Sequence, residues 1–290
     1  MRRAVPWIWA VLLVAQAPGA AQAAGEAGAR GLPDVVVDAH WLRRHLDVVT
    51  VVDARPAAAY AAGHIPGAAS LPSEAVVSET APARLQPLQR LRALIEAAGV
   101  RPGRPVVVYD EGALRAAARL FWLLELLGHP AVAVLDGGWP AWAAQDGAAA
   151  SGAPAPAGGG RFVPAPRSGR LATRLDVLLA PLRPEVVLLD ARPPDDPGPP
   201  LPGAVRLPAR RNLDGQGRLL PRPRLRALYG RWLERGRRFV VYCEGGRDAA
   251  LAYLALRRLG AEVALYHGSL REWRRAQGGI LGRPLEVPRG

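Results

Sequence analysis

The chain contains a single cysteine, Cys243, whose surroundings are those of an anion-binding turn. It follows an apolar β-type run, and two glycines and then a pattern with helical spacing come after it. A strand-to-helix turn presents unpaired backbone N–H groups, and the helix dipole adds partial positive charge there. Because such a turn stabilises anions, we expect it to lower the pKa of the thiol and to hold a thiolate or a persulfide.

The loop after the predicted strand combines glycine with charged side chains. Gly245 and Gly246 permit the backbone dihedral angles that a tight turn needs. Arg247 can face an anionic substrate, whereas Glu244 opposes one. A single cysteine cannot form a disulfide within the chain, so Cys243 is either an inert buried residue or a reactive one. The glycine loop directly after the strand favours the reactive alternative, so we predict that Cys243 is a catalytic nucleophile. The residues expected to cradle its sulfur are Glu244, Gly245, Gly246, Arg247 and Asp248.

The chain contains two copies of one pattern, each built from matching short motifs in the same order. Such ordered repetition is hard to obtain by chance and predicts two tandem domains of one fold. The motifs of the first copy are Asp53-Ala54-Arg55, Ile65-Pro66-Gly67-Ala68, the run 106–110, Leu127-Gly128 and Asp136-Gly137-Gly138. Their counterparts are Asp190-Ala191-Arg192, Leu201-Pro202-Gly203-Ala204, the run 239–243, Leu259-Gly260 and His267-Gly268-Ser269.

The repeat sets the domain boundaries and the fold class. We predict a first domain over residues 34–150, a linker rich in Pro, Gly and Ala over 151–167, and a second domain over 168–288. Within each copy short β-rich runs alternate with helical patterns, which favours an α/β fold with a mostly parallel sheet flanked by helices. In the second domain the expected strands are 186–189, 239–242 and 263–266, and the expected helix is 248–258.

The N-terminus has the features of an export signal. A basic start precedes an apolar run over residues 4–15, and Ala21-Gln22-Ala23 matches the small-x-small site that signal peptidase cuts. We therefore predict a signal peptide over residues 1–23, a periplasmic or secreted mature chain, and no stable membrane association after cleavage. An uncleaved anchor is the alternative, although the apolar run is short for a membrane span, which needs about 20 residues.

The composition is that of a globular protein with a strong positive charge. The 290 residues carry a formal net charge of +13, with a sequence pI of about 11.2. All basic residues are arginines and they are scattered, so we predict no nucleic-acid partner and instead a small anionic substrate. The sequence shows neither metal-ligand spacing nor a glycine-rich nucleotide loop, so we expect no metal and no cofactor.

The Asp-Ala-Arg strand ends, the Ile-Pro-Gly-Ala element, the Tyr242-Cys243 loop and the Gly268-Ser269…Glu272-Trp273 ending together resemble the rhodanese family in its tandem form. The resemblance implies two rhodanese-like domains with the active site in the second, at the domain interface. It implies a sulfurtransferase whose cysteine takes a sulfane sulfur from thiosulfate or 3-mercaptopyruvate, holds it as a persulfide, and passes it to a thiophilic acceptor such as cyanide or a thiol. The family's substrate-binding arginine carries over to Arg192, with Asp190 as its structural partner.

The chain departs from the family pattern in several places. Asp110 stands in the first copy where the second has Cys243, so we expect the first domain to be catalytically inactive. The loop after Cys243 matches neither a strongly basic thiosulfate-type loop nor the Gly-Ser-Gly-Val-Thr mercaptopyruvate type, which leaves the choice of donor open. Pro200 replaces the histidine that the first copy has at His64, so any role of that histidine is lost in the second domain.

Two other functions compete with a sulfurtransferase. A tyrosine-phosphatase-like enzyme also uses a cysteine at a strand–loop–helix turn, but it needs an arginine six residues later to clamp phosphate, and position 249 is alanine. A non-enzymatic persulfide carrier for a protein partner would use the same loop as the enzyme. Turnover with thiosulfate and cyanide separates carrier from enzyme, because a carrier stalls after one sulfur per chain.

The remaining notable side chains have structural interpretations. We expect His64 to be a packing or turn residue and Arg55 to be an ion-pair partner, and we assign His267 no role. The tryptophans expected in the core or between the domains are Trp139, Trp142 and Trp273.

Overall fold

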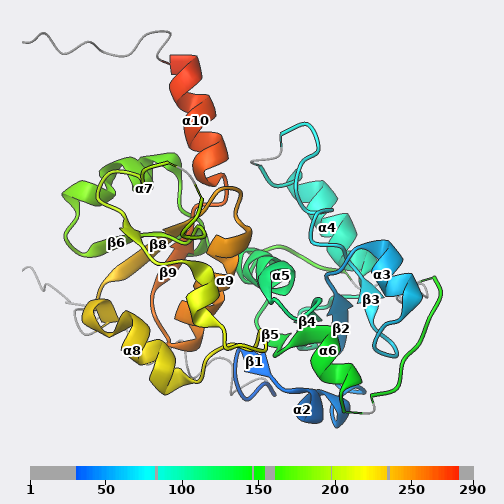
Figure 1. The fold of residues 1–290 in the computed structure, drawn as a ribbon. Coiled ribbons are helices and arrows are strands. Elements are labelled where there is room, and N and C mark those ends of the chain that lie inside the picture. The colour runs from blue at the N-terminus through cyan, green and yellow to red at the C-terminus, as the bar shows by residue number, and fades with distance from the viewer. Residues whose placement is uncertain are drawn as a thin grey trace, which may run out of the picture.

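The computed structural model places the chain in two α/β domains that lie side by side (Figure 1). Helices α5 (Arg115–Leu126) and α9 (Arg247–Arg258), one from each domain, pack against each other at the centre. The described residues are 31–81, 84–145, 147–153, 161–196, 198–233 and 236–280, with side chains described as far as residue 276. No helix in these ranges is both long and apolar enough to cross a membrane.

The first domain contains a five-stranded parallel sheet in the order β1-β5-β4-β2-β3. Parallel strands need both faces covered, which explains the uninterrupted apolar runs in β4 and β5. The strands are β1 (Val36–Val37), β2 (Thr50–Asp53), β3 (Ala69–Ser70), β4 (Val106–Tyr109) and β5 (Val132–Leu135). The helices besides α5 are α2 (Ala39–Arg43), α3 (Ala57–Ala62), α4 (Leu88–Ala97) and α6 (Gly138–Ala143).

The second domain repeats this plan with a four-stranded parallel sheet in the order β7-β6-β8-β9. A parallel bridge from Leu171 to Leu265 continues the sheet where the first domain has β1. The strands are β6 (Val186–Asp190), β7 (Val205–Arg206), β8 (Arg238–Tyr242) and β9 (Val263–Leu265). The helices besides α9 are α7 (Arg174–Leu179), α8 (Arg222–Leu233), α10 (Ser269–Ile280) and the 3-10 turns η1 (Ser168–Arg170), η2 (Ala180–Leu182) and η3 (Ala209–Asn212). The expected strands and helix of this domain are therefore confirmed to within one residue at each end.

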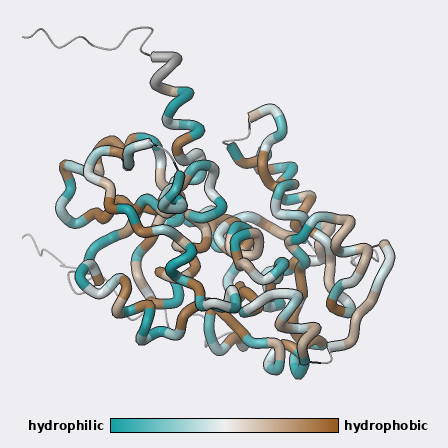
Figure 2. Tube along the Cα trace, viewed as in Figure 1, coloured by the Kyte–Doolittle hydropathy of each residue, from teal (hydrophilic) through white to brown (hydrophobic). Residues whose placement is uncertain are grey.

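Apolar side chains form one core shared by both domains and a further core on the outer face of each sheet. Figure 2 shows the strands and central helices in largely hydrophobic colours, whereas the described part of α10 is mostly hydrophilic. Alternation along β8 assigns Val240 and Tyr242 to the outer core and Val241 to the shared one. Cys243 continues that alternation and so faces the first domain.

A buried polar network fastens the two central helices together. Glu125 of α5 accepts hydrogen bonds from Tyr253 Oη at 2.6 Å and from Arg257 Nη2 at 2.9 Å, both on α9. The Glu125 and Arg257 side chains are only 9% and 7% exposed. A buried pair of this kind is costly to break, so it holds the domains in one relative position.

The predicted linker 151–167 is partly integrated into the first domain. Residues 154–160 lie outside the described ranges, but Phe162 is buried and its N–H donates to Glu96 Oε1 at 2.9 Å. Ala165 N–H donates to Leu127 O at 2.9 Å, and the backbone approaches Gly128 too closely for a Cβ atom there. The glycine of the repeated Leu-Gly motif is thus required in the first domain by this contact.

Candidate active site

Cys243 lies where the sequence predicts, directly after β8 and before α9. β8 pairs with β6 in parallel, and Tyr242 is in register with Asp190, so the carboxyl ends of both strands meet at one edge of the sheet. Ligand sites of open parallel sheets form at this edge. The side chain of Cys243 is only 1% exposed, because it faces the core between the domains.

The turn after Cys243 folds back onto the sulfur. Gly246 has φ +88°, in the left-handed region that favours glycine, and its N–H points to Sγ of Cys243 at 3.0 Å. A Cβ atom at Gly246 would meet Nδ1 and the carbonyl oxygen of His267 at 3.1 Å each. Two constraints, backbone angle and close approach, therefore require glycine at this position.

Burial raises the pKa of the Cys243 thiol above its ordinary value, even though the N–H groups of Ala249, Gly245 and Gly246 favour the thiolate. The nearby Asp248 carboxylate raises it further. The expectation that the loop lowers this pKa is therefore wrong for this structure. Removal of the thiolate from water outweighs the backbone donors in this conformation.

The start of α10 supports the loop from the side opposite α9. Ser269 adopts φ +51°, and its Oγ accepts from Cys243 N–H at 3.2 Å and donates to Tyr266 O at 2.9 Å. The N–H groups of Leu270 and Arg271 donate to the carbonyls of Cys243 and Glu244 at 3.1 and 3.2 Å. These first-turn N–H groups would otherwise lack partners, so helix and loop stabilise each other.

The equivalent loop of the first domain shows what such a turn can bind. Asp110, the counterpart of Cys243, places its carboxylate inside the turn. Oδ1 accepts from the N–H groups of Gly112 at 2.8 Å and Leu114 at 3.1 Å, and Oδ2 accepts from Ala116 at 3.0 Å and Ala117 at 3.2 Å. The first domain thus fills its own anion site with its own side chain.

Arg192 is enclosed and held by carboxylates of its own domain. Its side chain is 0% exposed; Nη2 donates to Asp190 Oδ2 at 2.6 Å and Nη1 to Asp196 Oδ1 at 3.0 Å. Arg55 makes the matching bond to Asp53 at 2.6 Å in the first domain, as expected of an ion-pair partner. An anion could reach Arg192 only by displacing these carboxylates. Donor binding by Arg192 stays a prediction that this conformation does not favour.

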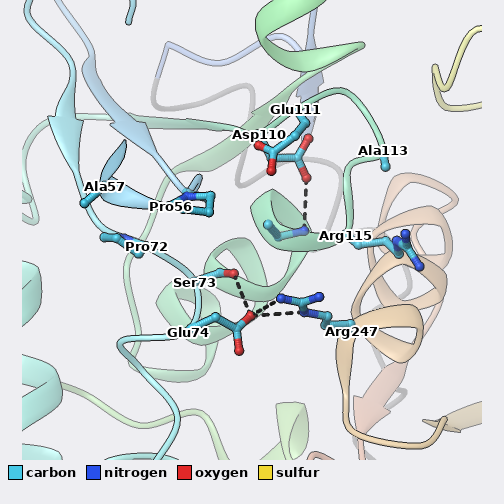
Figure 3. Close-up of a pocket in the computed structure, with 12 residues that line it drawn as sticks. Pro56, Ala57, Pro72, Ser73, Glu74, Asp110, Glu111, Ala113, Arg115 and Arg247 are labelled. Atoms are coloured by element: carbon cyan, nitrogen blue, oxygen red, sulfur yellow. Dashed lines mark hydrogen bonds and ion pairs between the residues drawn. The ribbon is translucent and has the colours of Figure 1, made fainter. Parts of the chain in front are cut away.

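A cleft of about 410 Å³ lies between the first-domain loop and the start of α9 (Figure 3). Arg247 lines it from the second domain, and Arg115 adds a further guanidinium from α5. Arg247 donates through Nε to Oε1 of Glu74, a first-domain residue, at 3.0 Å. The other lining residues include Ser73, Asp110 and Glu111. The cleft reaches the cysteine loop at Arg247, and the buried Cys243 is not among the residues that line it.

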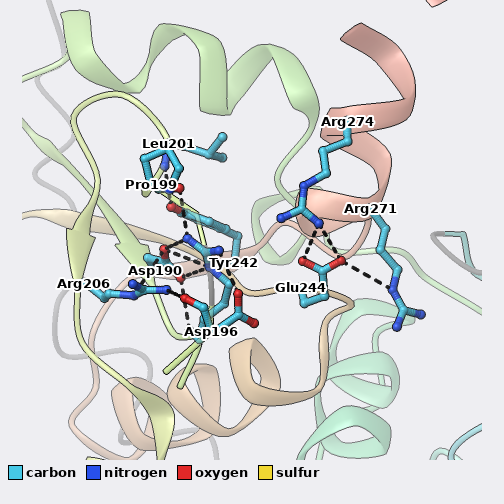
Figure 4. A network of polar contacts seen from close by, with 10 residues as sticks. Asp190, Asp196, Pro199, Leu201, Arg206, Tyr242, Glu244, Arg271 and Arg274 are labelled. Atoms are coloured by element: carbon cyan, nitrogen blue, oxygen red, sulfur yellow. Dashed lines mark hydrogen bonds and ion pairs between the residues drawn. The ribbon is translucent and has the colours of Figure 1, made fainter. Parts of the chain in front are cut away.

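The loop carboxylates are compensated by arginines. Glu244 accepts from Arg274 Nη1 at 2.9 Å and lies 3.9 Å from Arg271 Nε, both on α10 (Figure 4). Asp248 accepts from Arg115 Nη1 of the first domain at 3.2 Å. These ion pairs reduce the electrostatic repulsion that Glu244 and Asp248 would otherwise exert on an anionic donor.

Two side chains beside the loop were not anticipated from the sequence. Arg119 of α5 donates through Nη2 to the carbonyl of Gly245 at 2.8 Å. His267 stacks on Trp122 of α5 with ring centroids 5.1 Å apart, and burial lowers its pKa to about 3, so it is neutral. The signal for Arg119 is present in the sequence, because a charged residue within an apolar helix requires a buried partner. By contrast, His64 is a packing residue as expected, stacked on Tyr60 at 3.8 Å.

Fold and site together define a tandem α/β protein with one cysteine at an anion-binding turn. The rhodanese-like domain family matches the chain twice, at residues 38–145 and 175–276, and the chain belongs to this family.

Two curated relatives and a solved structure agree with this assignment. The chain is 32% identical over 265 residues to the 3-mercaptopyruvate sulfurtransferase of Escherichia coli (strain K12), covering 82% of this chain and 94% of the relative. It is 33% identical over 241 residues to the thiosulfate sulfurtransferase of Azotobacter vinelandii, covering 77% and 87%. The crystal structure of the 3-mercaptopyruvate sulfotransferase SseA from Escherichia coli superimposes with a TM-score of 0.72 at 30% identity, covering 81% of this chain and 98% of that one. The predictions of a tandem rhodanese fold and of a sulfurtransferase are confirmed.

Proposed function

We propose that Cys243 accepts a sulfane sulfur from thiosulfate or 3-mercaptopyruvate and passes it to a thiophilic acceptor such as cyanide or a thiol. The observation that carries this proposal is the pair of equivalent turns. The first-domain turn binds a carboxylate through four N–H groups, and the second-domain turn has a cysteine at the same position. A persulfide anion on Cys243 would find the same kind of donors.

The reaction consists of two displacements at sulfur. The Cys243 thiolate attacks the outer sulfur of thiosulfate, a sulfur–sulfur bond forms, and sulfite leaves with the electron pair of the bond that breaks. With 3-mercaptopyruvate a carbon–sulfur bond breaks instead, and the pyruvate enolate takes up a proton. The acceptor then attacks the terminal sulfur of the persulfide and releases the Cys243 thiolate.

The surrounding charges suit an anionic donor. Arg247 lines the cleft from the second domain, and Arg119 is bonded to the loop carbonyl of Gly245 at 2.8 Å. Their positive charge offsets the repulsion between a donor anion and the Cys243 thiolate. The loop backbone supplies the donors for the transferred sulfur.

Replacement of the nucleophile tests this function. We expect Cys243→Ser to abolish sulfur transfer, and intact-protein mass spectrometry should show one added sulfur in wild type but none in the variant after exposure to thiosulfate. Many turnovers per chain with cyanide support an enzyme, whereas arrest after one sulfur supports the carrier alternative. Turnover by Cys243→Ser comparable to wild type would remove Cys243 from the reaction.

We further propose that the chain is exported and cleaved after Ala23. Residues 1–23 lie outside the described ranges, and the proposal rests on the basic start, the apolar run and Ala21-Gln22-Ala23. Mature protein from the native host should begin at Ala24 by N-terminal sequencing and appear in the periplasmic or secreted fraction. Recovery of the intact chain from Met1 in the membrane fraction would contradict cleavage and favour an uncleaved anchor.

A further inference from the structure

Glu74, in the loop after β3 of the first domain, is bound by two guanidinium groups at the cysteine loop. Arg247 contacts its Oε1 through Nε at 3.0 Å and also through Nη2. Arg119 Nη1 lies 3.4 Å from the same oxygen. Ser73 Oγ lies 3.4 Å away as a weaker partner (Figure 3). One carboxylate oxygen therefore occupies the point at which cationic groups from both domains converge.

Arg119 cannot follow Glu74 if that carboxylate moves. Its side chain is 4% exposed, and its Nη2 is fixed to the loop carbonyl of Gly245 at 2.8 Å. Within the described part of the chain, its buried Nε has no hydrogen-bond partner. Burial lowers the pKa of Arg119, because the guanidinium has lost water that would otherwise stabilise its positive charge. The site beside the cysteine loop thus needs an anion whether or not Glu74 supplies it.

The Glu74 side chain can move away from Arg119 and Arg247. Its side chain is 59% exposed, and that of Arg247 is 54% exposed, so both can turn into water at small cost. Desolvation opposes ionisation of Glu74, but hydrogen bonds from Arg247 and the charge of Arg119 hold its pKa below the ordinary value, so it is an anion at neutral pH. It also lines the cleft that leads to Arg247.

We propose that the Glu74 carboxylate occupies the subsite for the anionic group of the sulfur donor, and that a donor carboxylate or sulfonate displaces it from Arg119 and Arg247. This inference rests on the proposed function, because it names the part of the donor that the cleft recognises. A guanidinium binds carboxylates and sulfonates in the same geometry, so one subsite serves both donor classes. Glu74 is then a competitor that sets the affinity for every anionic donor.

Binding of sulfate tests the subsite without any sulfur transfer. Sulfate is a dianion whose oxygens match those at the sulfonate end of thiosulfate, and it contains no sulfane sulfur. Glu74→Ala should lower the dissociation constant for sulfate about fivefold, the change expected from removal of an exposed ion-pair competitor. Glu79→Ala, which removes an exposed carboxylate from the same loop, should leave it unchanged. Isothermal titration calorimetry of the full chain measures these constants.

Further variants keep the test decisive. Glu74→Gln preserves side-chain size and should show the same tightening if Glu74→Ala folds poorly. Addition of Arg247→Ala to Glu74→Gln should reverse the gain, because one of the two guanidiniums is then missing. Equal sulfate affinity in wild type and Glu74→Gln, or a gain that survives Arg247→Ala, would overturn the subsite. Failure of Cys243 to load with sulfur would instead contradict the proposed function and leave the sulfate result intact.

Discussion

Arg192→Ala distinguishes a donor-binding arginine from a structural one. The substitution removes the guanidinium that bonds Asp190 at 2.6 Å and Asp196 at 3.0 Å. Asp190 is 0% exposed, so its carboxylate would lose its main counter-charge inside the protein. Removal of one partner of a buried ion pair costs about 3–5 kcal/mol, and we expect a loss of that size in the free energy of unfolding.

Urea unfolding followed by circular dichroism measures this loss, and thiosulfate–cyanide kinetics on the folded fraction measure donor binding. Arg55→Ala is the matched control, because Arg55 bonds Asp53 in the same way in the domain that has no cysteine. Both variants should lose comparable stability, and neither should change KM for thiosulfate by as much as Arg247→Ala. An Arg192→Ala protein of wild-type stability with a KM raised tenfold would refute this reasoning and place Arg192 on the donor.

Three other expectations follow from the site and the interface. The pKa of Cys243 is raised in the folded protein, so its alkylation by iodoacetamide should continue to accelerate at pH values above the ordinary thiol pKa; an alkylation rate that levels off below pH 7 would contradict this. The free energy of unfolding should fall as pH rises from the ordinary thiol pKa towards the raised one, because the thiol of the unfolded chain ionises first. Asp110→Ala should destabilise the protein by about 1–3 kcal/mol, since four N–H groups lose their acceptor, while mass spectrometry still finds sulfur on Cys243; failure to load would give the first-domain loop a chemical role. Glu125→Ala should cost about 3–5 kcal/mol by urea unfolding, and a loss below 1 kcal/mol would show that the buried network does not hold the domains together.

The fold was predictable because its signals are local and occur twice. In the second domain, apolar runs predicted β6, β8 and β9 to within one residue of their ends, and the repeated motifs showed that both halves share one plan. The glycine pair after Cys243 pointed to the turn because Gly246 needs a left-handed backbone, a constraint that acts on sequence directly.

The contacts across the domain interface could not be predicted in the same way. Glu74 and Arg247 are far apart in the chain and meet only because α5 packs on α9, which no local pattern specifies. The role of Arg192 could not be read from the sequence for a related reason, since a strand-end arginine can face a ligand or its own aspartate and the sequence is identical in both cases. The repeated Asp53–Arg55 pair, in a domain without a cysteine, was the available hint toward the structural role.

The side chain of Asp110 ends the same number of bonds from its backbone as a cysteine that carries a sulfane sulfur. Its oxygens stand two bonds beyond Cβ, which is also where the outer sulfur of a persulfide stands. The first domain therefore carries a permanent, unreactive analogue of the persulfide that we propose for the second domain. A Cys243→Asp substitution would place the same carboxylate in the active loop and mimic the sulfur-loaded enzyme in an unreactive form. Such a variant would be suited to capturing acceptors that dissociate once the sulfur has been transferred.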